Sequence, residues 1–396
     1  MSAPPFRIAR VVTRLGVGGA ALHVALLTKH LDPRAYETRL FAGPTRFPEG
    51  DMLALRGETS FAPHLIPSLR RDTAVIRDLR ALRDLVRHFR HFRPDLVDTH
   101  LSKAGFLGRL AAKICGVAAI HTFHIDIFSG YDWNPTQRSL FLQLERRAAR
   151  WSARLVCLSD DLGAQILEHR IGEAAQFRTI NLGLELDDFD VSHSQINVIR
   201  EKLRAELDLP RDAVLIGHIS RLAPVKSVKT FIQAAAILAL NHPNITFLVI
   251  GEGETRARLE SLARELKLGP KIRFLGLRSD IAQLNLALDA VTLTSLQEGT
   301  PISIIESLAA SRAVVASDVG GVSRLIEHER TGLLTPSGDS VAVSRALERV
   351  LNEPQNAASW GENGRAKMRR EFDVSRMIAD HDELYREVLG VHKIAQ

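Results

Sequence analysis

The sequence is poor in cysteine and has no long apolar run. Only two of its 396 residues are cysteines, Cys115 and Cys157, and no cysteine and histidine cluster has the spacing of a zinc site. Buried free thiols in a reducing cytoplasm are the simplest interpretation. No segment approaches the roughly 18 unbroken apolar residues of a membrane span, and residues 1–7 lack the apolar region of a signal peptide. We therefore expect a cytoplasmic protein.

Low-complexity tracts and repeats of solenoid period are also lacking. The hydrophobic content of 45% and the charged content of 25% are ordinary for a soluble globular enzyme. A chain of 396 residues is long enough for two domains, each with its own hydrophobic core.

Two carboxylates lie eight positions apart after a β-rich apolar segment, which predicts a buried parallel strand. Glu298 falls in the loop after this strand, and Glu306 falls about one turn inside the next helix. Between them, Gly299, Thr300 and Pro301 favour a free backbone, an N-cap and a first helical residue. Ligands of doubly wound sheets bind at this edge, so one carboxylate can reach a sugar and the other ribose hydroxyls, with phosphates between them. The alternative is a capped helix with two solvated glutamates.

A second strand-to-helix loop supplies two cations. Arg221 and Lys226 follow an apolar strand predicted at residues 213–216. Arginine can bind phosphate oxygens through two N–H groups and lysine adds a compact charge, so the pair suits a diphosphate better than a lone carboxylate. Further strands are predicted within residues 247–254, 274–278 and 313–318. Helical segments alternate with them, so the second half is predicted to be a βα repeat with its polar loops on one edge.

The order and spacing of these motifs resemble the family 4 retaining glycosyltransferases, which have the architecture called GT-B. The resemblance runs from Arg10 to about Leu389. In the second half it includes the Arg221 and Lys226 pair, the turn 251–254, the E-x7-E motif of Glu298 and Glu306, the glycine pair 320–321 and the turn 331–334. It implies an α/β fold of two Rossmann-like, doubly wound parallel-sheet domains that face each other across a cleft.

The resemblance also implies a division of labour between the domains. Residues 1–190 would form an N-terminal Rossmann-like, acceptor-binding domain, and residues 191–373 a C-terminal, nucleotide-sugar-binding one. The last two strands of the first domain are expected near 156–159 and 179–183. The C-terminal helix, about 374–396, is expected to pack back on the first domain.

The first half begins with a short strand, predicted at 8–12, and a Gly-rich turn. Residues 14–24 resemble the family segment Arg-Leu-x-x-Gly-Gly-x-x-x-His-Val, whose loop lies near donor and acceptor, and this adds Gly18 and Gly19 to the donor site. A dinucleotide site is the alternative for a Gly-rich turn, but G-x-G-G lacks the full G-x-G-x-x-G spacing, which disfavours an oxidoreductase.

Two histidines follow the strand predicted at 117–120. A histidine at a strand end is more often a structural hydrogen-bonding group than a catalyst, and this is the role expected for His121. For His124 the resemblance implies that the imidazole approaches hydroxyls of the donor sugar. Relatives often continue with Gly-His, whereas this chain has Ile125 and Asp126, which leaves the local contacts to sugar or acceptor open.

The resemblance gives the other residues their roles. Arg221 and Lys226 would offset charge on the departing diphosphate, Glu306 would hold the ribose diol, and Glu298 would orient the sugar ring with His124. The predicted catalytic residues are His124, Glu298, Arg221 and Lys226. The predicted donor-binding residues are Gly18, Gly19, Arg221, Lys226, Leu277, Glu298, Gly299, Thr300, Pro301, Ile302, Ser303 and Glu306. No cofactor and no metal are expected, because the formal D-x-D of Asp188 and Asp190 falls in the predicted linker, 185–195.

Positive charge is concentrated in the first half. Residues 1–190 carry 26 Lys and Arg against 21 Asp and Glu, largely because of the basic segment 70–93. There Ile76, Leu79, Leu82, Leu85, Val86, Phe89 and Phe92 lie at helical spacing. A helix packed on its sheet with a solvated basic face is favoured; the alternative is a face that contacts anionic membrane lipids or a lipid-diphosphate acceptor. Nucleic acid would require a larger excess and interleaved aromatics, so no nucleic-acid partner is expected.

The sequence therefore predicts a metal-independent, retaining hexosyl- or N-acetylhexosaminyl-transferase. Its donor is expected to be a nucleotide-diphosphate sugar, UDP-linked, and its acceptor a glycan, a lipid-linked sugar or a small molecule in surface-polysaccharide or glycoconjugate biosynthesis. A sugar-nucleotide epimerase on the same scaffold would instead isomerise its donor without an acceptor. A catalytically inactive binding subunit is the third hypothesis, against which the retained motif residues argue.

Overall fold

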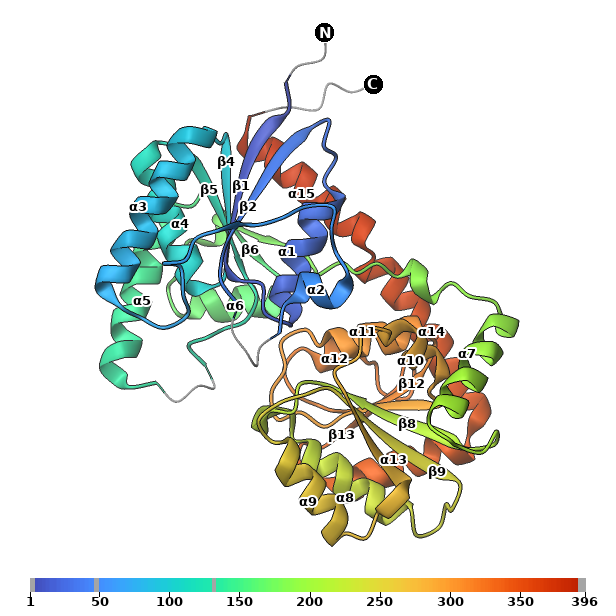
Figure 1. Cartoon of the computed structure of the whole chain (residues 1–396). Helices are drawn as coiled ribbons and strands as arrows, with labels where there is room; N and C mark the ends of the chain where they lie inside the picture. Colours follow the sequence, from blue (N-terminus) through green and yellow to red (C-terminus); the bar gives the residue numbers. More distant parts are fainter. Residues whose placement is uncertain (1–3, 46–49, 130–132, 391–396) are drawn as a thin grey trace. The chain divides into compact units, whose positions relative to one another are not determined.

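The fold is described from a computed structural model of the chain, for residues 4–45, 50–129 and 133–390. The chain divides into two compact units (Figure 1). The first unit comprises Met1–Leu184 and Val374–Gln396, and the second comprises Glu185–Asp373. Residues 391–396 of the predicted C-terminal helix lie outside the described residues.

The first unit is built on a seven-stranded sheet of order β3-β2-β1-β4-β5-β6-β7, in which every neighbouring pair is parallel. The strands are β1 (Phe6–Arg14), β2 (Tyr36–Gly43), β3 (His64–Leu65), β4 (Leu96–His100), β5 (Ala118–Phe123), β6 (Arg154–Cys157) and β7 (Phe177–Thr179). The helices are α1 (Gly19–His30), α2 (Met52–Arg56), α3 (Val75–Phe92), α4 (Ser102–Cys115), α5 (Pro135–Ala149), α6 (Asp160–Glu168) and α15 (Val374–Val388).

Alternation along the central strands gives the two faces of this sheet different characters. Ala9, Val11 and Val97 belong to the hydrophobic core formed with α3 and α4. The intervening Arg10 and Asp98 face the other way, toward α1 and α15, because successive side chains of a strand point to opposite faces. One face is therefore apolar and the other carries buried polar groups.

The end of the first unit differs from the prediction. A strand was predicted at 179–183, but the last strand, β7, ends at Thr179. Beyond it the chain turns to α15: the Gly183 amide donates to the Met377 sulfur at 3.1 Å, and the Val374 amide donates to the Leu184 carbonyl at 2.9 Å. The apolar pattern that suggested a strand reflects packing beneath this helix.

The boundary between the units falls after Leu184, six positions before the predicted residue 190. Asp187 and Asp190 explain why the segment 185–190 belongs to the second unit. Both carboxylates form ion pairs with Arg369, and Asp190 also pairs with Arg365, on the helix α14 (Pro354–Phe372) of that unit.

Helix α3 is only partly packed. Leu85 and Phe89 are buried in the core, whereas Ile76 is 70% exposed and Leu79 is 60% exposed, so the predicted apolar stripe does not pack along its whole length. Contact of the basic face of this helix with anionic lipids or with a lipid-diphosphate acceptor, the alternative interpretation of the sequence, stays a hypothesis. Within the described ranges, no helix is both long and apolar enough to cross a membrane.

The second unit contains a six-stranded parallel sheet of order β10-β9-β8-β11-β12-β13. Its strands are β8 (Val214–Ile219), β9 (Ile245–Ile250), β10 (Ile272–Gly276), β11 (Ala290–Leu293), β12 (Ala313–Ser317) and β13 (Leu333–Thr335). Its helices, besides α14, are α7 (His193–Glu206), α8 (Val228–Leu238), α9 (Arg256–Glu265), α10 (Ile281–Ala287), α11 (Ile302–Ala309), α12 (Val322–Leu325) and α13 (Ser340–Asn352).

Both sheets reverse their strand order at one point, between β1 and β4 and between β8 and β11. Loops that leave the carboxyl ends of such neighbouring strands diverge to opposite faces and open a crevice, where ligands of doubly wound folds bind. Arg221 and Lys226 follow β8, Glu298 follows β11, and His100 ends β4. The topology thus gathers Arg221, Lys226 and Glu298 at the reversal point of the second sheet.

Candidate active site

The lysine and glutamate of the second unit contact each other. Lys226 Nζ donates to Glu298 Oε1 at 2.6 Å, and the Ser295 hydroxyl donates to the same oxygen at 2.6 Å. The Glu298 side chain is 7% exposed and that of Lys226 is 23% exposed. Arg221 is exposed and has no ion-pair partner in the part of the chain that the structure describes. The free cation of this loop is therefore Arg221, while Lys226 is balanced by Glu298.

The loop after β11 leads directly into helix α11. The helix begins at Ile302 with Pro301 at the N-cap position and without a side-chain cap, so the prediction that Thr300 caps it and Pro301 is its first residue is wrong. Proline has no N–H to satisfy, which suits it to this position. Intrahelical bonding starts with the Ile304 and Ile305 amides, both donating to the Pro301 carbonyl, at 3.2 and 3.4 Å. The amides of Ile302 and Ser303 precede these bonds and remain available to an anion.

The other predicted donor residues lie around these two loops. Glu306 lies in α11 and is partly buried, and Gly299 and Thr300 lie in the loop before it. Leu277 directly follows β10 at the edge of the sheet, and its side chain is 50% exposed. The Leu296 amide donates to the Val225 carbonyl at 2.8 Å and so ties the glutamate loop to the cation loop.

Glycines fix the position of both loops. A Cβ atom at Gly251 would lie 2.0 Å from the Ser220 carbonyl oxygen, and one at Gly253 would lie 2.3 Å from that of Leu222. Under the other loop, a Cβ at Gly320 would lie 2.0 Å from the Glu298 carbonyl oxygen, and one at Gly321 1.9 Å from that of Gly299. Any side chain at these places would displace the loop backbone, since such contacts are far inside van der Waals distance. The two glycine turns of the sequence motif thus support the charged residues.

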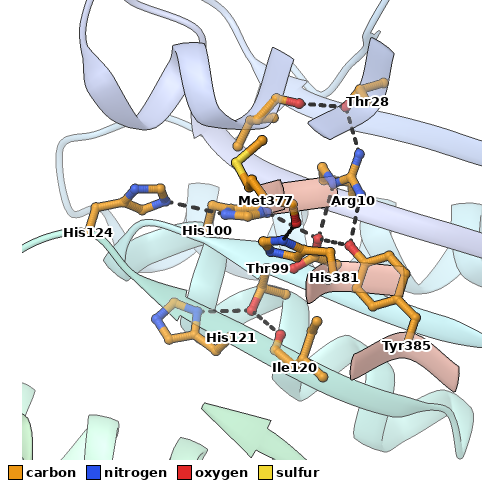
Figure 2. Close-up of polar contacts among 12 residues, drawn as sticks. Arg10, Thr28, Thr99, His100, Ile120, His121, His124, Met377, His381 and Tyr385 are labelled. Carbon is orange, nitrogen blue, oxygen red and sulfur yellow. Dashed lines mark hydrogen bonds and ion pairs between the residues drawn. The ribbon is translucent and has the colours of Figure 1, made fainter. Parts of the chain in front are cut away.

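In the first unit, His124 belongs to a cluster of buried histidines (Figure 2). His124 Nε2 lies 3.3 Å from His100 Nδ1, and His100 Nε2 lies 3.2 Å from Asp98 Oδ2. The rings of His23 and His381 pack beside them: the centroid of His23 lies 5.2 Å from that of His124 and 5.4 Å from that of His381. Strand β4 and the helices α1 and α15, which are distant from one another in the sequence, therefore contribute to the surroundings of the predicted catalytic histidine.

Asp98 is the anion at the centre of this cluster. Arg10 Nε donates to its Oδ2 at 3.0 Å and the Tyr385 hydroxyl donates to the same oxygen at 2.7 Å. Burial alone would raise the pKa of the Asp98 carboxyl, but the His100 ring and the Arg10 guanidinium beside it hold that pKa well below its usual range. Asp98 is thus a buried carboxylate whose charge Arg10 balances.

Three histidines of the cluster, His23, His124 and His381, are neutral near pH 7. Burial, together with the neighbouring His100, lowers the pKa of His124 to about 3. Burial also lowers the pKa of His381 to about 4 and moves the pKa of His23 well below its usual value. Neutral imidazole has one donor and one acceptor nitrogen, so His124 can bind a hydroxyl and does not offer a positive charge to a phosphate.

Several neighbouring residues have structural roles. His121 Nδ1 lies 3.0 Å from the Thr99 hydroxyl oxygen, and its ring fills the space that a side chain at Gly105 would need. Asp126 is buried and accepts hydrogen bonds from the Phe128 amide at 2.8 Å and from His169 Nε2 at 2.9 Å. Asp126 therefore shapes the loop after β5, and of the two unusual residues only Ile125, 41% exposed, has a side chain at the surface.

Gly18 and Gly19 occupy the start of α1. Gly18 is the N-cap residue and Gly19 the first residue of the helix, which presents His23 to the cluster four residues later. The D-x-D of Asp188 and Asp190 lies in a short helical turn where Asp190 pairs with two arginines. Among the described residues, no group of three His, Cys, Asp or Glu is arranged to hold a metal ion.

The sequence interpretation missed Asp98, His100, His23 and His381. Asp98 and His100 lie at the end of strand β4, and His23 belongs to the Gly-rich motif. Their partnership with His124 depends on the pairing of β4 with β5 and on α15, which returns from the end of the chain.

Two Rossmann-like units, with cations and paired glutamates at a strand-order reversal, define the class of GT-B glycosyltransferases. Residues 17–188 match the sequence family described as Glycosyltransferase Family 4, and residues 199–367 match the family described as Glycosyl transferases group 1. The chain therefore belongs to the family 4 (group 1) glycosyltransferases, and it is a retaining glycosyltransferase, as predicted.

Relatives agree with this assignment, and a solved structure agrees with the fold. The chain is 28% identical over 340 residues to the Escherichia coli UDP-Gal:alpha-D-GlcNAc-diphosphoundecaprenol alpha-1,3-galactosyltransferase, covering 84% of this chain and 85% of that protein. It is 29% identical over 320 residues to the 2-deoxystreptamine glucosyltransferase of Streptomyces kanamyceticus, covering 78% and 82%. HepE of Anabaena, solved with UDP and glucose, superposes with a TM-score of 0.81 at 24% identity over 96% of this chain and 99% of that one. The predicted GT-B fold is confirmed; the roles of single residues stay predictions.

Proposed function

We propose that this enzyme transfers a hexose or N-acetylhexosamine from a UDP-sugar to a glycan, lipid-linked or small-molecule acceptor in surface-polysaccharide or glycoconjugate biosynthesis. The E. coli relative acts, by its name, on UDP-Gal and a diphosphoundecaprenol-linked sugar, and HepE was solved with UDP. The observation that carries the proposal is the Lys226–Glu298 contact beside the free Arg221, at the strand-order reversal of the second sheet.

The proposed donor site uses charge in two ways. Arg221 has no ion-pair partner among the described residues, so it binds the diphosphate without breaking an existing ion pair. It stabilises the negative charge that grows on the leaving group as the glycosidic bond breaks. Lys226 is already held by Glu298 in the free enzyme, so it is positioned before the donor arrives. The same contact holds Glu298 in place to accept hydrogen bonds from sugar hydroxyls.

Helix α11 supplies the rest of the donor site. The amides of Ile302 and Ser303 stand at the positive end of the helix dipole, which favours phosphate oxygens. Glu306, one turn further, accepts hydrogen bonds from the ribose diol in this proposal. His124 of the first unit binds a hydroxyl of the sugar substrate.

A panel of nucleotide sugars tests the proposal by thermal shift. A donor present at about 100 times its Kd adds about 2.7 kcal/mol of stability, which raises the melting temperature measurably. UDP-sugars should stabilise the wild-type protein, and Glu306→Gln should reduce the shift while Glu329→Gln, an exposed glutamate on another turn, should not. Stabilisation by GDP- or ADP-sugars alone would overturn the UDP assignment.

Product analysis then tests the reaction. The stabilising donor should be hydrolysed slowly, with retention of the anomeric configuration in the released sugar. Isomerisation of the donor with no acceptor present would instead identify an epimerase.

A further inference from the structure

The contacts from Asp98 through His100 to His124 form a directed chain (Figure 2). Asp98 Oδ2 lies 3.2 Å from His100 Nε2, and His100 Nδ1 lies 3.3 Å from His124 Nε2. The side chains of Asp98 and His100 are fully buried. A neutral imidazole carries hydrogen on only one of its two nitrogens. The nitrogen that carries it in His100 therefore determines which nitrogen of His124 must carry it.

The chain begins at an ionised carboxylate. Asp98 Oδ2 accepts hydrogen bonds from Arg10 Nε and from the Tyr385 hydroxyl, so it has no proton to give. The 3.2 Å contact between His100 Nε2 and Asp98 Oδ2 is an ion-pair distance whose angle falls outside that of a hydrogen bond. This nitrogen must nevertheless carry hydrogen, because two lone pairs 3.2 Å apart would repel each other. His100 Nδ1 is then a lone pair, and His124 Nε2 must donate to it.

The charge balance of the cluster supports a neutral His100. The titratable groups that face it are Arg10 on β1, His23 on α1, Asp98 on β4, His124 after β5, and His381 and Tyr385 on α15. Arg10 and Asp98 already cancel each other, so a protonated His100 would add a net charge to a buried site. A protonated His100 would still face Asp98 with the hydrogen on Nε2 but would also donate from Nδ1, which would reverse the contact with His124.

We propose that Asp98 and His100 are positioning residues that hold His124 with its proton on Nε2, so that His124 presents the lone pair of Nδ1 to a substrate hydroxyl. His124 Nδ1 is buried and has no hydrogen-bond partner among the described residues. His23, whose ring meets that of His124 edge-on at 89°, fixes the plane in which the lone pair points. The group bound there is a hydroxyl donor, and phosphate oxygens, which are acceptors only, are excluded. The identity of this hydroxyl as one of a sugar rests on the proposed function.

Long-range proton–nitrogen correlation spectra of ¹⁵N-histidine-labelled protein test the proton positions directly. The spectra of His100→Asn and His124→Gln variants assign the signals of the two rings by their disappearance. Both wild-type rings should show the pattern of a neutral imidazole protonated on Nε2. A His124 protonated on Nδ1, or a His100 protonated on both nitrogens, would overturn the proposal. This measurement needs no substrate, so it stays decisive even if the proposed donor is wrong.

Asp98→Asn tests the coupling of the two rings. Arg10 Nε, the Tyr385 hydroxyl and His100 Nε2 all approach Asp98 Oδ2, so the asparagine oxygen should take that place and both rings should keep their proton on Nε2. If the amide nitrogen takes that place instead, the protons of both rings should move to Nδ1 together. A change in one ring alone would show that His100 does not control the proton position of His124.

Two substitutions of His100 separate positioning from packing. The oxygen of His100→Asn falls near the place of Nδ1 and can still accept from His124, whereas His100→Gln carries its amide near the place of Nε2 and leaves His124 without an acceptor. With the stabilising donor, His100→Gln should lower kcat by about 10- to 100-fold with a smaller change in KM, the usual range for residues that support a functional histidine. His100→Asn should recover most of this loss, and His121→Gln, a buried histidine that does not contact His124, should act as control. Equal loss in both His100 variants would reduce the role of His100 to packing.

Discussion

The two units both place their site residues just after the carboxyl ends of parallel strands but rely on opposite electrostatics. In the second unit, Arg221, Lys226 and Glu298 are charges on loops near the surface, supported from below by glycines. In the first unit, His124 is neutral and stands in front of a fully buried ion pair, Arg10–Asp98. A loop that meets a diphosphate needs charge, while a group that meets a neutral hydroxyl needs a fixed direction. The two units share one type of fold. The side chains that follow the strands decide whether a unit offers charge to a diphosphate or a directed hydrogen-bonding group to a hydroxyl.

Removing the buried anion should have the largest effect. Asp98→Ala leaves Arg10 as an uncompensated charge in the core, which should cost about 3–5 kcal/mol of unfolding free energy. Glu298→Ala, which frees a partly exposed Lys226, should cost much less. Urea unfolding of both variants checks this, with the exposed Asp95→Ala as a control. Similar losses of unfolding free energy in Asp98→Ala and Glu298→Ala would mean that the burial of the ion pair does not distinguish the two units.

Removing a cation from the second unit should affect catalysis more than folding. Arg221→Ala and Lys226→Ala should each lower kcat/KM by roughly 10²-fold or more, because they stabilise charge that develops on the leaving diphosphate. Lys229→Ala, on the exposed side of α8, is the matched control. Near wild-type turnover in either variant would refute the assignment of that cation.

Acid should destabilise the first unit more than the second. His124 and His381 have pKa values lowered to about 3 and about 4, and that of His23 is also lowered, whereas the second unit has the one buried histidine His218 with a pKa of about 3 among the described shifts. The unfolded chain takes up these protons first, so the stabilisation is complete above the unfolded pKa near 6.5 and is lost as pH falls toward the folded values. Each histidine contributes at most about 1.4 kcal/mol per pH unit in this window.

Amide hydrogen exchange followed by mass spectrometry resolves the two units in this pH window. After correction for the intrinsic pH dependence of exchange, protection in β1, β4 and β5 should fall more between pH 6.5 and 4.5 than protection in β8, β9 and β11. Equal losses in the two sheets would contradict the expected difference.

The two glutamates of the second unit should affect different kinetic constants. Glu306→Gln should raise the donor KM with a smaller effect on kcat, since the ribose does not change between ground state and transition state. Glu298→Gln should mainly lower kcat, because its contacts strengthen as the sugar gains positive character. Initial rates with varied donor at saturating acceptor separate the two. The reverse pattern would exchange their roles.

The smallest effect is expected from a chelator. Arg221, Lys226 and the start of α11 already offer positive charge to the diphosphate, so EDTA should leave the transfer rate almost unchanged. Complete loss of activity with EDTA and its recovery with manganese would revive Asp188 and Asp190 as metal ligands.

The sequence predicted structure within single segments of the chain, but it did not predict contacts between segments that are distant in the sequence. Apolar runs identified most strands, and the spacing of Arg221, Lys226, Glu298 and Glu306 placed them correctly after β8 and β11 or in α11. The contact between Lys226 and Glu298, 72 positions apart, depends on β8 and β11 being neighbours, which no local pattern encodes. The start of α11 was misplaced because Thr300 and Pro301 both suit a helix start.

The histidine cluster was still less accessible to sequence reasoning. Each of His23, His100 and His381 looks like an ordinary polar residue in its own segment. Only the sheet pairing and the return of α15 bring them to His124. Ile76 and Leu79 are exposed although they belong to an apolar pattern with regular helical spacing. Such a pattern predicts the helix, but it does not predict how much of the helix packs against the sheet.

The position of α15 in the chain has a consequence for biosynthesis. Tyr385 and His381 lie beyond the last residue of the second unit, so a ribosome synthesises residues 1–373 before it adds them. Until then the Asp98 carboxylate lacks the Tyr385 hydroxyl, and the face of the sheet that carries it lacks its covering helix. The first unit is thus begun first and finished last. Translation that stops before α15 yields a chain in which the surroundings of His124 are incomplete, so the order of synthesis delays the assembly of this site until α15 has been made.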